Sequence, residues 1–175
     1  MVCEGCLVAS EGEGVELIDV CGGDLKQIVR LNRSCLPHVN DIDMDAFCHY
    51  LWHADHFRVA RENGTILGFL VGLGPGHDYD SPNYRWFSER YDTFLYVDRI
   101  VVAAQARGRG IGRSLYAEAE AQAARTGCPL ACEVNLRPRN DASLAFHERL
   151  GFTRVGEQDT EDGAKTVALL LKQTR

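Results

Sequence analysis

The sequence predicts an α/β domain in which a mixed sheet carries helices packed on its faces. Strand-type and helix-type runs follow one another in the order β, α, α, β, β, β, α, β, α, β, β, which is typical of that architecture. A length of 175 residues matches one ordinary domain, which buries about 70% of its unfolded surface. We expect residues 14–175 to form this single domain and residues 1–13, rich in glycine and glutamate, to be a flexible tail.

The N-terminal half alternates strands and helices whose ends carry turn and cap residues. The predicted elements are a strand over 14–20, a helix over 24–36 that Pro37 ends, a helix over 41–55, and strands over 56–61 and 65–73. Asn63-Gly64 between the last two strands is a strong hairpin signal. The aromatic, polar and turn-rich stretch that follows predicts a functional loop or a short excursion.

The C-terminal half continues the alternation. It predicts a strand over 93–102, a helix over 113–125 closed by Gly127, a strand over 129–136, a helix over 142–150, and a terminal hairpin of 152–157 with 165–171. Asn140 and Asp141 are suited to cap the helix over 142–150, and Gly151 to end it. We find no internal repeat and no low-complexity linker in the sequence.

Charge and hydrophobic patterning exclude several classes of protein. Nineteen basic against 25 acidic residues give a net charge of −6, which argues against nucleic acid as a partner. No run of about 18 apolar residues predicts a membrane span. The N-terminus lacks a basic segment followed by an apolar stretch, so it does not resemble a signal peptide. We therefore expect a cytoplasmic protein that acts without a membrane.

The cysteines and histidines do not form a convincing metal site. Seven cysteines at irregular spacing favour reduced thiols over a disulfide framework. Cys3 and Cys6 form a CxxC, but Cys128 and Cys132 make a poor second pair because their spacing runs into a buried strand. His49 and His53 lack the glutamate of a metalloprotease motif. We expect no metal.

The strongest chemical signal is a glycine-rich turn between the strand over 93–102 and the next helix. Free backbone N–H groups and the helix dipole at such a turn bind phosphate or pyrophosphate. Glycine lets the phosphate oxygens approach the amides, and the interleaved arginines supply positive charge. The residues concerned are Arg107, Gly108, Arg109, Gly110, Gly112 and Arg113. The sequence contains no Walker A loop, and Arg113 replaces the third glycine of a Rossmann fingerprint.

At this turn the chain resembles the GNAT superfamily of N-acetyltransferases. Arg107, Gly110 and Gly112 meet its pyrophosphate motif [QR]-x-x-G-x-[GA], and residues 140–152 nearly meet a second motif, N-x-x-A-x-x-x-Y-x-x-x-G-F. The two motifs lie about 30 residues apart with a strand between them, as in that family. The resemblance covers roughly residues 94–157, and the earlier part by element order alone. The chain is also similar to a group of bacterial predicted acetyltransferases of unknown substrate.

The resemblance implies a mostly antiparallel sheet of about seven strands, splayed between the fourth and fifth, with about four helices. It implies acetyl-CoA as cosubstrate, with the pantetheine paired to the main chain of the splayed strand and a backbone N–H polarising the thioester carbonyl. The residues it implies for this cosubstrate are Ile100, Val101, Val102, Arg107, Gly108, Arg109, Gly110, Ile111, Gly112, Arg113, Ser114, Asn135, Asn140, Ser143 and Phe146.

The sequence departs from the family at a position with chemical consequence. His147 stands where most relatives have a tyrosine credited with protonating the leaving thiolate. His147 is a candidate to protonate or hydrogen-bond the sulfur, and the alternative is a packing role. Two candidates remain for the base: Glu133, and Asp98, which alternation places on one strand face with Tyr96 and Ile100, while Arg99 would face the other way.

The stretch 77–98 combines carboxylates with aromatic rings, a pattern that attracts a cationic amine. The substrate-binding candidates are Asp80, Tyr84, Trp86 and Tyr96, although packing on the sheet is an alternative for each aromatic. The expected acceptor is a small amine, an amino acid or a protein N-terminus. Two alternatives stay open, a non-catalytic CoA-binding regulatory module and an acyltransferase using a longer acyl-CoA. Whether the protein acts as a monomer or a homodimer also stays open.

Overall fold

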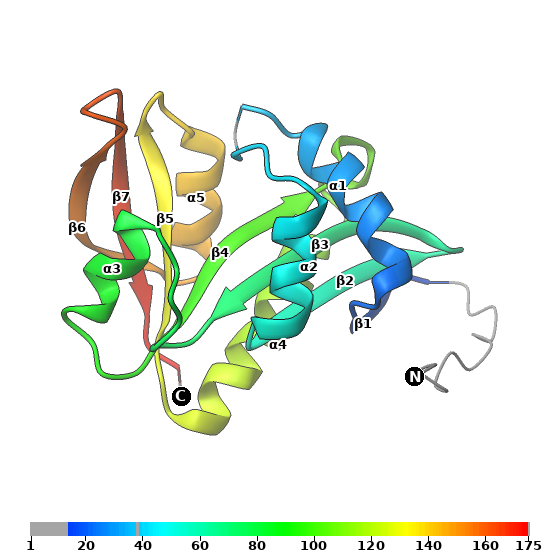
Figure 1. The fold of residues 1–175 in the computed structure, drawn as a ribbon, viewed down its shortest axis with the longest axis horizontal. Helices are drawn as coiled ribbons and strands as arrows, with labels where there is room; N and C mark the ends of the chain where they lie inside the picture. The colour runs from blue at the N-terminus through cyan, green and yellow to red at the C-terminus, as the bar shows by residue number, and fades with distance from the viewer. Residues whose placement is uncertain (1–13, 38, 175) are drawn as a thin grey trace.

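One seven-stranded sheet organises the chain, and helices cover both of its faces (Figure 1). The computed structural model describes residues 14–37 and 39–174, so the expected tail and the Cys3–Cys6 pair lie outside the described residues. The strand order is β1-β2-β3-β4-β5-β7-β6. Neighbouring strands are antiparallel except β4 and β5, which are parallel. The mixed, mostly antiparallel sheet expected from the sequence is confirmed.

The strands and helices follow the predicted order closely. The strands are β1 (Glu16–Asp19), β2 (His56–Glu62), β3 (Thr65–Leu73), β4 (Leu95–Val102), β5 (Leu130–Arg137), β6 (Thr153–Thr160) and β7 (Lys165–Lys172). The helices are α1 (Leu25–Arg33), α2 (Met44–His53), α3 (Pro82–Ser88), α4 (Ile111–Thr126) and α5 (Asp141–Arg149), with short 3₁₀ turns at Gly22–Asp24 and Ala104–Ala106. The helix α3 is the one α-helix that the sequence did not predict.

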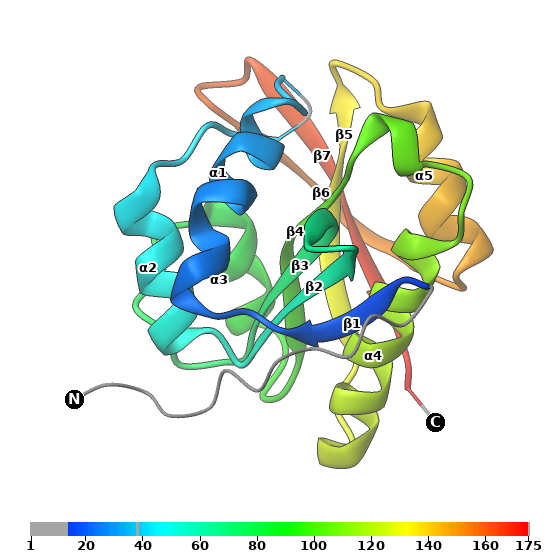
Figure 2. The same cartoon turned by 90° about the vertical axis from the view of Figure 1, so that its right-hand side faces the viewer.

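The sheet separates two hydrophobic cores. Figure 2 shows α1, α2 and α3 on one face and α4 and α5 on the other. Phe47 of α2, Phe69 of β3 and Phe87 of α3 are fully buried in the first core. Leu115 of α4 and Leu130 of β5 are fully buried in the second. Because burial of such side chains is worth about 1.5–3 kcal/mol each, both layers are held firmly to the sheet.

The sheet parts in its middle. Among the described residues, pairing between β4 and β5 is confined to two register positions, Leu95 with Leu130 and Tyr96 with Ala131. Beyond Tyr96, β4 stays paired with β3, while β5 stays paired with β7. The two parallel strands therefore diverge toward their carboxyl ends, and the expected splay between the fourth and fifth strands is present.

The start of helix α3 is fixed by its N-cap, and the helix shows no periodic pattern of hydrophobic residues. The Ser81 hydroxyl accepts a hydrogen bond from the backbone N–H of Tyr84 at 3.3 Å, and Pro82 occupies the first helical position. A serine followed by proline is a favourable helix start, because proline needs no N–H partner there. The helix has seven residues, too few to show helical periodicity in the sequence. The Ser81-Pro82 pair was the signal available in the sequence.

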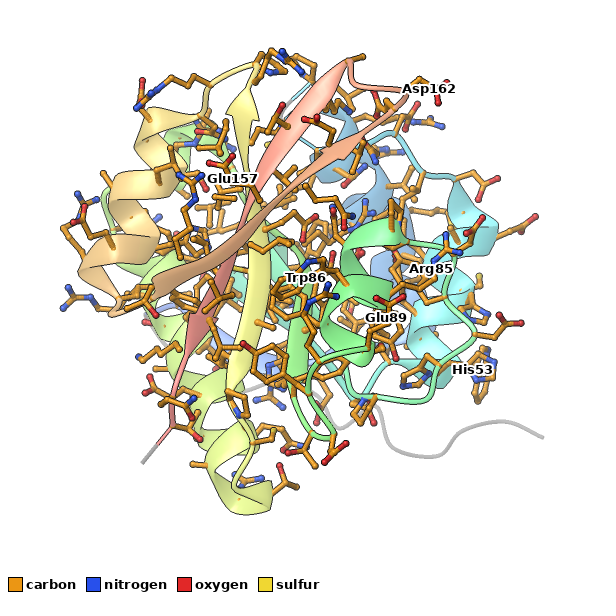
Figure 3. The ribbon with its side chains drawn as sticks, turned by 90° about the vertical axis from the view of Figure 1, so that its left-hand side faces the viewer. His53, Arg85, Trp86, Glu89, Glu157 and Asp162 are labelled. Atoms are coloured by element: carbon orange, nitrogen blue, oxygen red, sulfur yellow. The ribbon has the colours of Figure 1, made fainter. Side chains whose placement is uncertain are left out.

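A close contact and a hydrogen bond hold α3 against β6. A Cβ atom added at Gly156 would lie 2.8 Å from the Trp86 ring, so the glycine permits the indole to approach the strand closely. Figure 3 shows Trp86 on the side of α3 that faces the sheet, with Arg85 and Glu89 on its outer side. Gln158, two residues along β6, donates to the side-chain oxygen of Asn83 at 3.1 Å.

We predict that Gly156→Ala destabilises the protein by about 1–3 kcal/mol, because the added methyl group overpacks the Trp86 contact. The control is Gly22→Ala, since a Cβ at Gly22 meets no atom within 4 Å. Chemical denaturation of the three proteins measures the difference in the free energy of unfolding. Equal midpoints for parent and Gly156→Ala would show that α3 adjusts freely on the sheet.

Candidate functional site

A deep cleft opens where β4 and β5 diverge. Its volume is about 1050 Å³, and it passes between the strands from one face of the sheet to the other. The α4 and α5 side of the cleft contains the glycine-rich turn and His147. The opposite side contains the segment between α1 and α2, the start of α3 and the β6–β7 hairpin. The cleft therefore has two mouths separated by the parted strands.

The glycine-rich turn lies at one mouth and leads into α4. Gly108 and Gly110 have positive φ angles of 78° and 84°, a left-handed backbone that glycine adopts without strain. Gly110 directly precedes the first residue of α4, so the unpaired N–H groups of that helix face the mouth. A Cβ at Gly112 would lie 3.2 Å from the Phe146 ring. The turn can hold a phosphate by backbone donors and helix dipole together.

The cosubstrate candidates implied by the resemblance divide into two groups. Those lining the cleft are Ile100, Val101, Val102, Arg107, Gly108, Gly110, Ile111, Gly112, Arg113, Asn135, Asn140, Ser143 and Phe146. Arg109 instead turns back to β2, where it forms a bidentate pair with Glu62. Ser114 is exposed on α4 outside the cleft lining. Arg107 and Arg113 thus supply the positive charge at the turn.

A β-bulge in β4 changes the faces expected for Asp98 and Arg99. Val71 pairs with Arg99 and the next residue, Gly72, pairs with Val97, so Asp98 is the extra residue. The bulge puts Asp98 and Arg99 on the same face, where their side chains form an ion pair at 2.8 Å. The expectation that Arg99 faces away from Asp98 was wrong, because simple alternation fails at a bulge.

Asp98 is saturated by its neighbours. Its carboxylate accepts hydrogen bonds from the hydroxyls of Tyr50, at 2.9 Å, and Tyr79, in addition to the Arg99 pair. Its side chain is 5% exposed. Burial, reinforced by the Asp98 charge, raises the pKa of both tyrosines, so they remain donors. An aspartate held in this way ties α2 and the loop before α3 to β4, and both of its oxygens are occupied by these three donors.

Glu133 on β5 has the properties of a base poised near neutrality. The hydroxyl of Tyr96, across the parted strands, donates to its carboxylate at 2.6 Å. Burial raises the pKa of Glu133 to about 7, a shift that the donated hydrogen bonds oppose. A carboxylate with a pKa near the working pH is an efficient general base. Of the two candidates for the base, Glu133 is the one with an incompletely satisfied carboxylate in the cleft.

His147 lies in the cleft wall with both ring nitrogens engaged. Its Nε2 is 2.7 Å from the hydroxyl of Tyr116 on α4, and its Nδ1 is 2.8 Å from the backbone oxygen of Ser143. Since a carbonyl only accepts, Nδ1 carries the proton, and neutral Nε2 accepts from Tyr116. Burial lowers the pKa of His147, which favours this neutral ring. Tyr116 also lines the cleft, and the sequence analysis did not select it.

The four substrate-binding candidates are dispersed. Asp80 lies at the second mouth of the cleft. Tyr96 is buried beneath Glu133, and Tyr84 is a core residue whose hydroxyl donates to the Gly74 carbonyl at 2.7 Å. Trp86 packs on β6, outside the cleft lining. The aromatic residues of this stretch therefore serve mainly to pack α3, and Asn83, which the sequence analysis passed over, enters the lining instead.

Other features leave the cleft as the main candidate. Across residues 14–37 and 39–174, no three histidine, cysteine or acidic side chains gather in a metal-binding arrangement. Cys128 and Cys132 are buried free thiols, and the His49 and His53 rings stack on α2 with centroids 4.4 Å apart. No helix within the described part of the chain is long and apolar enough to cross a bilayer.

Comparison with solved structures finds the same fold at low sequence identity. Ard1 from Thermoplasma volcanium superposes with a TM-score of 0.76 at 14% identity, covering 92% of this chain and 98% of its own. The yncA protein of Salmonella typhimurium, solved with its cofactor acetyl-CoA, gives 0.69 at 17% identity and coverages of 93% and 95%. Arabidopsis thaliana Naa50, in complex with the bisubstrate analogue CoA-Ac-MVNAL, gives 0.70 at 16% identity and coverages of 91% and 98%.

Sequence comparison identifies the family. An acetyltransferase of Yersinia pestis (strain Pestoides F) is 28% identical over 131 residues, which cover 74% of this chain and 81% of the relative. The model of the Acetyltransferase (GNAT) family matches residues 25–152, which include the glycine-rich turn, the parted strands and α5. With most of its length matched and its cleft in the splay of the sheet, the chain belongs to the GNAT family of acetyltransferases.

Proposed function

We propose that this acetyltransferase moves the acetyl group of acetyl-CoA to a primary amine, which attacks the thioester directly in a ternary complex. The observation that carries the proposal is the continuous cleft joining the glycine-rich turn to Glu133 through the gap between β4 and β5. A thioester and an amine that enter from its two ends and meet in the gap react as one molecule. This lowers the barrier by several kcal/mol without a covalent enzyme intermediate.

The donor half of the cleft suits CoA. The turn from Arg107 to Gly112 would hold the pyrophosphate, with Arg113 beside it. The pantetheine would then run along β4, whose main chain beyond Tyr96 has parted from β5. Its amides would pair with that open strand edge as a neighbouring strand would. A backbone N–H in the gap would polarise the thioester carbonyl, since such a donor stabilises the oxyanion of acyl transfer.

The acceptor half of the cleft suits an amine that carries polar groups. Asn40, Asp80, Glu161 and Lys165 line this mouth, and the Lys165 ammonium bridges Glu161 at 2.6 Å and Asn40 at 3.3 Å. The chemistry fits a small amine, an amino acid or a peptide N-terminus. Support for the last comes from Arabidopsis thaliana Naa50, which shares the fold and was solved with the bisubstrate analogue CoA-Ac-MVNAL.

The chemistry requires a base for the amine and a donor for the sulfur. Glu133 would take one proton from the substrate ammonium, and the neutral amine that results would attack the carbonyl carbon. The C–S bond breaks with its electron pair leaving on sulfur, and the sulfur takes up the second proton that the nitrogen loses as it becomes an amide. The Tyr116 hydroxyl lies in the donor half of the cleft and would stabilise this leaving group by donating to the sulfur in place of His147 Nε2.

A panel of free amines, amino acids and short peptides, assayed with acetyl-CoA by release of free thiol, tests the activity directly. Acceptor-dependent thiol release and an acetylated product are expected for at least one class. CoA binding without turnover on any class would favour a CoA-binding regulatory module over an enzyme. A parallel series of longer acyl-CoA donors measures the acyl-chain preference.

We predict that Gly110→Val weakens CoA binding at least 10-fold, because a β-branched side chain disfavours the left-handed φ of 84° and crowds the phosphate site. Gly127→Val at the other end of α4 is the matched control, since Gly127 also has a positive φ, of 66°. Calorimetric titration with CoA measures the Kd of each variant. Parental CoA affinity in a folded Gly110→Val protein would show that the turn does not belong to the CoA-binding site.

We predict that kcat/KM rises with pH through about 7 and levels off above it, because the Glu133 carboxyl must be ionised to accept the amine proton. In Glu133→Gln, kcat should fall by roughly 10²–10⁴-fold and this ionisation should disappear from the pH profile. Glu157→Gln, an exposed change on β6, is the control. Parental kcat in Glu133→Gln would assign the base elsewhere.

We predict that His147→Phe and Tyr116→Phe each lower kcat by roughly 10²-fold with little change in the Kd for CoA, because their interactions strengthen as charge develops on sulfur. Tyr84→Phe removes a hydroxyl of the same type from outside the cleft and should keep parental kcat. The assays should span pH 6 to 9. Full kcat over that range in both cleft variants would make the pair a packing contact.

A further inference from the structure

We propose that Tyr96 is a positioning residue that orients the Glu133 carboxylate across the parted strands through the hydrogen bond that its hydroxyl donates. The proposal rests on the assignment of Glu133 as the base and adds the group that directs it. The Tyr96 hydroxyl lies 2.6 Å from Glu133 Oε2. Because the bond occupies this oxygen, we assign the other one, Oε1, to the proton of the substrate ammonium.

The bond forms where the backbone pairing between β4 and β5 ends. Tyr96 and Ala131 make the last of the two register pairs between these strands. Glu133 is two residues further along β5, so alternation places it on the same face of the sheet as Ala131. That face meets the core in which Tyr96 and Ala131 are fully buried. The tyrosine therefore reaches forward over the gap to a carboxylate that main-chain pairing no longer ties to β4.

Two aromatic rings of α3 hold the Tyr96 ring in position. Tyr84 lies edge-on to it, with ring centroids 5.6 Å apart and an interplanar angle of 72°, and the Phe87 ring lies 5.9 Å away at 48°. All three rings are buried. The Tyr84 hydroxyl donates to the Gly74 carbonyl, so it does not compete for Glu133. Close packing of this kind fixes the direction of the Tyr96 ring and hence the place of its hydroxyl.

This packing gives α3 a role in the site. The contact of Trp86 with Gly156 holds the helix close to β6. Tyr84 and Phe87 of the same helix then pack on Tyr96, whose hydroxyl meets the base. The aromatic residues of α3 thus act on the reaction from the core, by holding the residue that orients Glu133, and need not contact the acceptor.

The same hydrogen bond favours the ionised form of Glu133. Burial raises the pKa of this carboxyl to about 7, and the Tyr96 donor opposes the rise. The ionisable groups that interact with it are Tyr96 and Asp98 on β4, Cys132 beside it on β5 and Tyr116 on α4. None of these four is a cation, so neutral donors must offset the burial of the carboxylate. Without the Tyr96 hydroxyl, more of Glu133 would be protonated at neutral pH and unable to accept a proton.

The test follows the Glu133 carboxyl directly, so that it does not depend on finding the acceptor. The protein is labelled with carboxyl-¹³C glutamate, the Glu133 resonance is identified by its absence in Glu133→Gln, and its chemical shift is followed by NMR over a pH range that brackets 7. The variant is Tyr96→Phe, which keeps the packed ring and removes the donor. Tyr84→Phe is the matched control, because it removes a buried hydroxyl of the same core that bonds Gly74 instead.

We expect the titration midpoint of Glu133 to rise by about 1–2 pH units in Tyr96→Phe, because the buried carboxylate loses a charge-assisted hydrogen bond. Tyr84→Phe should titrate as the parent does. With an acceptor identified, the rising limb of kcat/KM in Tyr96→Phe should move to higher pH by the same amount. A residue that only packs α3 against β4 would leave the midpoint unchanged, and that result in folded Tyr96→Phe overturns the proposal.

A measurement on the unaltered protein decides the question if Tyr96→Phe does not fold. With tyrosine labelled at ¹³Cζ and assigned by through-bond NMR, the Tyr96 resonance should shift with the same midpoint as the Glu133 carboxyl, and this response should vanish in Glu133→Gln. A Tyr96 resonance that ignores the Glu133 titration also overturns the proposal. An active Glu133→Gln enzyme would instead refute the base assignment, and both titrations would still report whether Tyr96 bonds this carboxyl.

Discussion

The parting of β4 and β5 is the constraint on which the rest of the site depends. Two parallel strands that pair through a full ladder would leave no room between them, whereas these two pair at Leu95 and Tyr96 and then separate. The backbone groups of β4 beyond that point need partners, and a pantetheine with two amides would supply them. Pairing of β4 with β3 and of β5 with β7 keeps each half of the sheet rigid while the gap stays open.

Two carboxylates near the gap have different environments. Asp98, displaced by the bulge, is satisfied by an arginine and two tyrosines and stabilises the packing of α2 against β4. Glu133 has a tyrosine donor at 2.6 Å and keeps a pKa of about 7. The difference lies in the hydrogen-bond donors that each carboxylate meets. Here one carboxylate is structural and the other is available for proton transfer.

The sequence predicted the parts of the fold that depend on local sequence patterns. Alternation, helix caps and the Asn63-Gly64 turn located seven strands and four helices, and the glycine-rich turn located one mouth of the cleft. Prediction failed where geometry depends on distant contacts. Asp98 breaks alternation because it is the extra residue opposite the junction of Val71 and Gly72 on β3, and α3 owes its position to Gly156, some 70 residues away. The partner of His147 was missed because Tyr116 reaches it from another helix.

The two mouths of the cleft belong to different parts of the chain. The donor mouth is made by one turn and the starts of two helices, and much of its binding would come from main-chain groups that side-chain substitution does not alter. The acceptor mouth is made by the segment between α1 and α2, the start of α3 and a hairpin, which are connecting segments that tolerate change. Under the proposed assignment of the two mouths, substitutions could therefore change the acceptor specificity while leaving the donor site intact.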